Sequence, residues 1–129
     1  MEIGLTVANI HLAPGKGNSE LRLSQLAAVI DSSPTERIAI IGDTNTRASE
    51  IAKIKDSGLE VPDLPGPTWN SFRNRFHADS PRFKASFTRC INHPDVKIRD
   101  LQILEGKVIR SEKTFYISDH FALFGRMQL

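Results

Sequence analysis

Apolar and polar residues alternate over residues 4–12, and this pattern predicts a β-strand. A Pro-Gly break follows at residues 14–18, after which Asn18 or Ser19 is suited to cap a helix. Apolar residues in that helix recur at i, i+3, i+4 and i+7, which predicts a buried stripe made of Leu23, Leu26, Ala27 and Ile30. Pro34 ends the helix because proline disfavours helical geometry in the residue before it.

The rest of the chain predicts one further helix and several strands. Residues 37–42 form a short, nearly continuous apolar run, which is typical of a strand in a sheet interior that is covered on both faces. A helix is predicted over 48–57, with Gly58 as its stop, and prolines make 60–68 an irregular loop. Strands are predicted near 86–92, 100–104 and 121–127, with a turn at 105–107. The pattern therefore predicts one α/β domain over residues 1–129.

Composition narrows the class of protein. The chain has 129 residues, of which 40% are hydrophobic and 25% charged, as in a globular protein rather than a disordered or fibrous one. It contains no apolar run near the ~20 residues that span a bilayer, so no membrane interaction is expected. Cys90 is the single cysteine, which excludes an internal disulfide and indicates a buried thiol. Glu2 stands where a signal peptide would need basic residues, so an intracellular location is expected.

Charge is concentrated in one part of the chain. Residues 70–90 hold five basic residues and one acidic residue, with five aromatic residues at 69–87 interleaved among them. Cations neutralise phosphates and aromatic rings stack on bases, so this stretch suits a phosphate-bearing ligand. A solvated strand face with inward-pointing rings explains the pattern equally well.

Polar residues at the ends of predicted strands are the candidates for chemistry. Asp43 and Asn45 follow the buried strand, and at extended spacing their side chains would point to the same side. A carboxylate can accept a proton from water while an amide donates to a phosphate oxygen, although both residue types also cap helices. Asp119-His120 adds a possible cation ligand and an imidazole. His11 ends the first strand, where a histidine is more often structural.

The order of these motifs resembles the endonuclease/exonuclease/phosphatase superfamily, which has the DNase-I-like fold. The 5′-tyrosyl-DNA phosphodiesterases are the branch that it resembles most. The resemblance rests on Ile10-His11-Leu12, on residues 21–26, on Gly42-Asp43-Thr44-Asn45-Thr46-Arg47, on Thr68-Trp69-Asn70-Ser71 and on residues 118–123. It implies an α/β (α+β) fold that is one half of a four-layer α-β-β-α sandwich.

The resemblance also implies a Mg²⁺- or Mn²⁺-dependent phosphodiesterase acting on nucleic acid or on 5′-tyrosyl phosphodiester bonds. Asp43 would activate the attacking water, Asn45 would hold the scissile phosphate, and His120 would stabilise the transition state. Asp119 would sit at the metal site, and His11 would contact the phosphate. The implied substrate-binding residues are Trp69, Arg73, Arg75, Lys84 and Arg89.

The chain departs from the family pattern in two ways. It matches only the C-terminal half of the family domain, so the half that carries the glutamate ligand of Mg²⁺ is not represented. Ser86 and Thr88 stand where the family has arginine and aspartate, and that aspartate supports the catalytic histidine. We therefore expect an exposed apolar sheet face, covered either by a missing N-terminal half or by a partner chain, with a fragment favoured. The alternative function is a catalytically degenerate module that binds nucleic acid or a protein.

Overall fold

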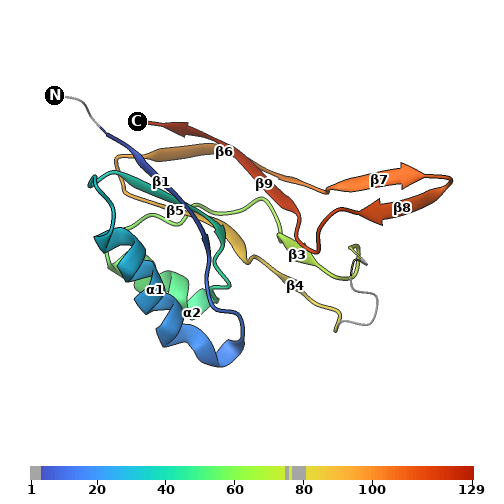
Figure 1. The fold of residues 1–129 in the computed structure, drawn as a ribbon, viewed down its shortest axis with the longest axis horizontal. Helices are drawn as coiled ribbons and strands as arrows, with labels where there is room; N and C mark the ends of the chain where they lie inside the picture. The colour runs from blue at the N-terminus through green and yellow to red at the C-terminus, as the bar shows by residue number, and fades with distance from the viewer. Residues whose placement is uncertain (1–3, 75, 77–80) are drawn as a thin grey trace.

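Two helices pack against one face of a three-stranded sheet, and a further pair of strands packs against the other face (Figure 1). The computed structural model describes residues 4–74, 76 and 81–129. The elements in chain order are β1 (Thr6–His11), η1 (Lys16–Asn18), α1 (Ser19–Asp31), β2 (Ile38–Asp43), α2 (Ala48–Asp56), β3 (Trp69–Asn70), β4 (Lys84–Ala85), β5 (Thr88–Asn92), β6 (Lys97–Leu104), β7 (Lys107–Arg110), β8 (Lys113–Tyr116) and β9 (Ala122–Gln128). The predicted α/β class is confirmed, and the prolines of residues 60–68 form a loop as expected.

The three-stranded sheet has the order β1-β2-β5, so the apolar run of β2 occupies its centre as predicted. β1 pairs with β2 in parallel, which places His11 opposite Asp43. β5 pairs with β2 in the antiparallel sense, which places Thr88 opposite Asp43 from the other side. The three residues therefore share one end of the sheet.

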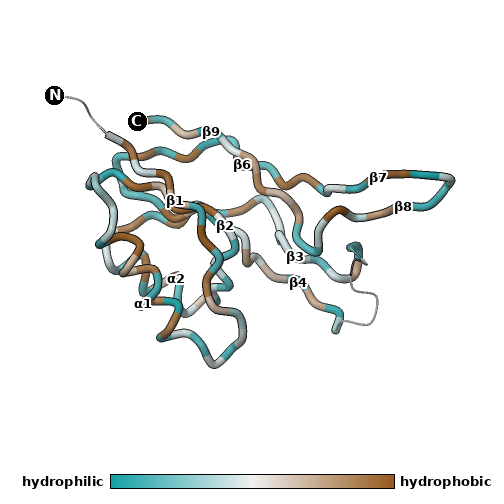
Figure 2. Tube along the Cα trace, viewed as in Figure 1, coloured by the Kyte–Doolittle hydropathy of each residue, from teal (hydrophilic) through white to brown (hydrophobic). Residues whose placement is uncertain are grey.

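The main core lies between this sheet and the helices. Ile38 and Ile40 of β2, with Ile91 of β5, pack against Leu26 of α1 and Ile54 of α2. Figure 2 shows apolar colour in the strands of this sheet and along parts of α1, and also in β6, β7, β8 and β9.

The predicted stripe of α1 is correct at three of its four positions. Leu23, Leu26 and Ile30 contact the core, whereas Ala27 is exposed. Arg22 is fully buried beside them because Glu50 of α2 neutralises its charge. A charged residue on a buried helix face needs such a partner, and α1 alone does not reveal it.

The opposite face of the sheet is only partly covered. β6 and β9 form an antiparallel pair that packs over β5 and part of β2. Val7 of β1 lies beyond this cover and is 52% exposed. The apolar face expected to be exposed is therefore open along β1, as expected for part of a layered sandwich.

Two short hairpins, β3–β4 and β7–β8, are present that the sequence pattern does not predict. In β7–β8 the turn residues Ser111 and Glu112 both have positive φ, a geometry that glycine or asparagine usually signals. The predicted turn is shorter than expected, since only Glu105 and Gly106 separate β6 from β7. The hairpin β7–β8 extends away from the sheets (Figure 1). Within the described residues, no helix combines the length and apolar character needed to cross a bilayer.

Candidate active site

The site lies where β1 and β2 end and β5 begins. Parallel strands bring their carboxyl ends to the same sheet edge, so His11 and Asp43 become neighbours there. The antiparallel β5 starts at that edge and adds Thr88. His120 approaches from the loop before β9, where an isolated bridge pairs it with Trp69.

Asp43 lies between two imidazoles. Its Oδ2 is 3.4 Å from Nε2 of His11 and 3.4 Å from Nε2 of His120. The side chains of Asp43 and His120 are each 20% exposed, whereas that of His11 is 74% exposed. The carboxylate is therefore accessible to solvent on the side of His11 and enclosed on the side of His120.

His120 is held by contacts from three directions. Its Nδ1 lies 3.0 Å from the hydroxyl oxygen of Thr88, and its backbone N–H donates to Oγ of Ser118 at 3.1 Å. The edge of its ring meets Trp69 at a centroid distance of 5.1 Å, and the ring of Phe87 lies 6.3 Å away. These contacts restrict the ring to one orientation beside Asp43.

Asn45 reaches the site by a different backbone path from the one predicted. Its φ is +50°, a left-handed conformation that asparagine tolerates, so it is not related to Asp43 by extended spacing. Its backbone N–H donates to Oδ1 of Asp43 at 3.1 Å, and its side-chain amide donates to the carbonyl of Leu12 at 3.0 Å. Because α2 begins at Ala48 with Arg47 at its N-cap, neither Asp43 nor Asn45 caps that helix.

Arg47 belongs to the site, although the sequence pattern did not mark it as a candidate. Its guanidinium carbon lies 4.7 Å from the ring centroid of Phe87, which places the cation over the aromatic face. Its Nε is buried and has no hydrogen-bond partner among the described residues. One feature of the sequence could have indicated Arg47: it stands in the same short segment as Asp43 and Asn45.

A buried ion pair fixes the two loops that flank Asp43. Arg22 donates to both carboxylate oxygens of Glu50 and also to the carbonyls of Ala13 and Gly15 at 2.9 and 2.7 Å. Glu50 in turn accepts the backbone N–H of Arg47 at 2.9 Å. Burial by itself raises the pKa of Glu50, but its hydrogen bonds and the charges of both arginines outweigh burial and lower it. The pair therefore links the loop after β1 to the loop after β2.

The candidate site contains an open cavity of about 540 Å³. Its lining consists of His11, Pro14, Gly15, Asp43, Asn45, Arg47, Trp69, Phe83, Phe87, Asp119 and His120. Trp69 stacks on Phe83 with ring centroids 5.6 Å apart, which gives the cavity an aromatic wall. The predicted residues Asp43, Asn45, Asp119 and His120 thus meet in one place, which argues against an accidental match of their motifs.

Of the predicted basic residues, the three that the structure describes, Arg73, Lys84 and Arg89, do not line this cavity. Arg73 forms an ion pair with Glu105 at 2.8 Å, and the exposed Lys84 lies beside it on the short strand β4. Arg75 lies outside the described residues.

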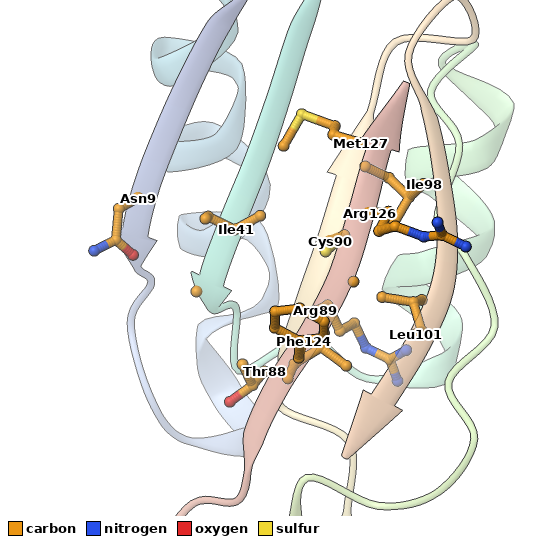
Figure 3. Close-up of a pocket in the computed structure, with 13 residues that line it drawn as sticks. Asn9, Ile41, Thr88, Arg89, Cys90, Ile98, Leu101, Phe124, Arg126 and Met127 are labelled. Atoms are coloured by element: carbon orange, nitrogen blue, oxygen red, sulfur yellow. The ribbon is translucent and has the colours of Figure 1, made fainter. Parts of the chain in front are cut away.

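Arg89 lies in a separate place, the pocket between the two sheets (Figure 3). This pocket has a volume of about 340 Å³, and Ile41 and Leu101 are among its apolar lining residues. Burial there lowers the pKa of Arg89, and its Nε has no hydrogen-bond partner among the described residues. Cys90 is buried as predicted, and burial raises the pKa of its thiol.

The residues present do not by themselves fit the Mg²⁺ that the resemblance implies. Mg²⁺ needs oxygen ligands in near-octahedral geometry, usually with one or two carboxylates. Asp43 faces two histidines, and Asp119 is the second carboxylate lining the cavity. Among the described residues, no group of three or more His, Cys, Asp or Glu side chains is placed to hold a metal.

Similar folds occur among solved structures. The chain superposes on a TDP2 structure from D. rerio, complexed with a single-strand DNA product, with a TM-score of 0.75 and 20% identity over 95% of this chain and 56% of that one. A truncated TDP2 from Caenorhabditis elegans gives a TM-score of 0.66 with 22% identity, over 92% and 52% of the two chains.

A third similar structure is an endonuclease/exonuclease/phosphatase family protein from Bacteroides thetaiotaomicron. It gives a TM-score of 0.53 with 18% identity, over 89% of this chain and 47% of that one. No protein-family model and no curated protein matched the sequence. The chain spans about half the length of the TDP2 structures that it matches. The chain therefore has the fold of about one half of a DNase-I-like endonuclease/exonuclease/phosphatase protein.

Proposed function

We propose that this chain carries the acid–base part of a site that hydrolyses phosphodiester bonds in nucleic acid. The observation that supports the proposal is the position of Asp43, a carboxylate held between two imidazoles at the floor of an open cavity. Asn45 and Arg47 line the same cavity and add an amide and a guanidinium. Carboxylate, imidazole, amide and guanidinium are the groups that an in-line displacement at phosphorus uses.

Each side chain has a defined task in this proposal. Asp43 accepts the proton of the attacking water. His120 and His11 present ring N–H groups to the phosphate oxygens, and Arg47 balances the charge of the phosphate. Trp69 and Phe83 provide the surface on which a base or a tyrosyl ring stacks. These residues position a phosphodiester and stabilise the charge that develops on it.

A second polypeptide unit is required by the same proposal. The inner face of the sheet is open along β1, and the apolar pocket that contains Arg89 lies beside it. Burial of this face by another unit removes apolar surface from water and brings an acceptor to Arg89. We propose that this unit, either an N-terminal half or a partner chain, also supplies the carboxylates needed for Mg²⁺ or Mn²⁺.

A non-catalytic nucleic-acid-binding module is the second candidate. One observation favours it: Thr88, which holds Nδ1 of His120, occupies the position where the resemblance implies aspartate. A neutral hydroxyl stabilises an imidazolium less than a carboxylate does. The cavity and its aromatic wall would then serve for binding alone.

The deciding experiment measures hydrolysis and binding of the same substrate, a single-stranded oligonucleotide with a 5′-phosphotyrosyl group. The full chain and its Asp43→Asn variant are assayed with Mg²⁺ or Mn²⁺, and Asp31→Asn on the exposed end of α1 serves as the matched control. Metal-dependent turnover that disappears only in Asp43→Asn supports the hydrolase. Salt-sensitive binding without turnover supports either the binding module or a hydrolase half that lacks the carboxylates of the second unit. Absence of both turnover and binding contradicts both candidates for this chain.

A further inference from the structure

The two ring nitrogens of His120 face groups of different character. Nδ1 lies 3.0 Å from Oγ1 of Thr88, a hydroxyl that both donates and accepts hydrogen bonds. Nε2 lies 3.4 Å from Oδ2 of Asp43, a carboxylate oxygen that only accepts. The ring is thus placed between a neutral partner and an anionic one.

This asymmetry selects one tautomer of the neutral ring. A neutral imidazole carries one N–H and one lone pair. A lone pair on Nε2 would face the negative charge of Asp43, whereas an N–H on Nε2 is attracted to it. The ring proton therefore belongs on Nε2, and the lone pair of Nδ1 accepts the hydroxyl proton of Thr88.

The backbone around Thr88 and His120 fixes this arrangement. Thr88 lies opposite Asp43 in the β2–β5 register, so both side chains are on the same face of the sheet. The backbone N–H of Thr88 donates to Oγ1 of Thr68 at 3.0 Å. The carbonyl of Thr68 accepts the N–H of Phe121 at 2.7 Å. One residue, Thr68, therefore anchors both the strand that carries Thr88 and the loop that carries His120.

We propose that Thr88 is the positioning residue of His120, whose neutral ring carries its proton on Nε2. The Thr88 hydroxyl donates to Nδ1 and holds the ring beside Asp43. Nε2 then presents an N–H toward the cavity, so His120 acts as a hydrogen-bond donor and not as a base at that nitrogen.

The charged and polar surroundings of His120 agree with this assignment. Asp43 faces it from β2, and His11 of β1 is on the far side of that carboxylate. Thr88 of β5 supplies the hydroxyl, Trp69 of β3 supplies a nearly perpendicular aromatic ring, and Asp119 precedes it in its own loop. Within the proposed function, the consequence is that Asp43 is the group that accepts the proton of water.

The test is a ¹⁵N NMR measurement of the His120 ring in the full chain, without substrate. The His120 resonances are assigned by their loss in His120→Gln. For the wild type we expect protonated Nε2 and unprotonated Nδ1 at high pH, where the ring is neutral. Thr88→Val removes the hydroxyl at nearly constant shape and should shift the Nδ1 resonance, because its lone pair loses a hydrogen-bond donor, while Asp43 keeps the ring proton on Nε2. Thr88→Ser should restore the wild-type shifts.

A matched control is Thr114→Val on the exposed strand β8, which should leave the His120 shifts unchanged. The proposal is overturned if wild-type Nδ1 is the protonated nitrogen at high pH, or if a folded Thr88→Val protein keeps the wild-type shifts. The wild-type spectrum is decisive even where Thr88→Val does not fold. Because no substrate is present, a chain without hydrolytic activity can still confirm the tautomer, and an active chain can still contradict it.

Discussion

Arg22 donates from Nε and Nη2 to the two carboxylate oxygens of Glu50, at 2.7 and 2.9 Å, and both side chains are fully buried. Removing one partner of a buried ion pair leaves the other charge without compensation, which typically costs about 3–5 kcal/mol. We therefore expect Glu50→Gln to lower the free energy of unfolding by about that amount, measured by urea denaturation. Glu36→Gln on the exposed surface is the control. Equal urea midpoints for Glu50→Gln and Glu36→Gln would contradict the expected contribution of the ion pair to stability.

The same ion pair makes stability depend on pH. Glu50 has a pKa below its ordinary value of 4.5, since hydrogen bonds and arginine charges outweigh the effect of burial. Its contribution is therefore fully present above pH 4.5 and is lost as the pH falls through the lower pKa of the folded state. We expect the urea midpoint of the wild type to fall between about pH 6 and about pH 3, and that of Glu50→Gln to fall less. Parallel pH profiles for the two proteins would contradict this assignment.

Arg47 tests the role of the cavity in binding phosphate. Lysine keeps the positive charge but lacks the planar guanidinium that lies over Phe87. We expect Arg47→Lys to weaken binding of a 5′-phosphorylated single-stranded oligonucleotide by about fivefold to tenfold. Fluorescence anisotropy at fixed salt measures the affinity, with Arg37→Lys, whose arginine faces Asp95, as the control. If Arg47→Lys and Arg37→Lys bound the oligonucleotide with equal affinity, the phosphate would not bind at Arg47.

Lys84, the exposed residue of β4, tests whether this strand contacts the nucleic-acid backbone. If it neutralises one phosphate of a single strand, Lys84→Ala should reduce the slope of log affinity against log salt by about 0.7. Lys55→Ala on α2, the helix layer away from the cavity, should leave the slope unchanged. A wild-type slope in Lys84→Ala would mean that this lysine is a solvated surface residue.

The reactivity of Cys90 shows whether the two sheets stay packed together in solution. Its side chain is buried and burial raises the pKa of its thiol, so little reactive thiolate forms near neutral pH. We expect a thiol reagent to label the folded chain at least about tenfold more slowly than the urea-unfolded chain. Rapid labelling of the folded chain would show that the sheets separate readily at this pocket.

Local sequence patterns predicted those elements in which hydrophobic residues recur at a regular spacing. The alternation before His11, the apolar stripe of α1 and the continuous run of β2 each place hydrophobic residues at a spacing that only one type of element can bury. The hairpin β7–β8 was missed because Ser111 and Glu112 adopt positive φ without the usual turn residues. The pairing of β7 with β8, which ends at Arg110 and Lys113, closes a turn that its own residues do not favour.

The candidate residues could be chosen from the sequence because polar side chains at strand ends stand out against apolar runs. Which of them meet depended on strand order. Parallel pairing of β1 with β2 placed His11 beside Asp43, and antiparallel pairing with β5 brought Thr88 to the same edge. Arg89, the next residue along β5, lines the pocket between the sheets and not the cavity around Asp43. Its position in the chain did not distinguish these two places, because they depend on how β6 and β9 pack over β5.

By itself, then, the sequence determined the helices, the main strands and the chemical types available at their ends, because these depend on local spacing. Only the tertiary structure decided that Arg22 and Glu50 neutralise each other, that Arg47 lies over Phe87, and that Asp43 lies between His11 and His120. Each of these relationships joins residues from separate elements. They depend on strand pairing and on the helix layer beneath it, which no single stretch of sequence encodes.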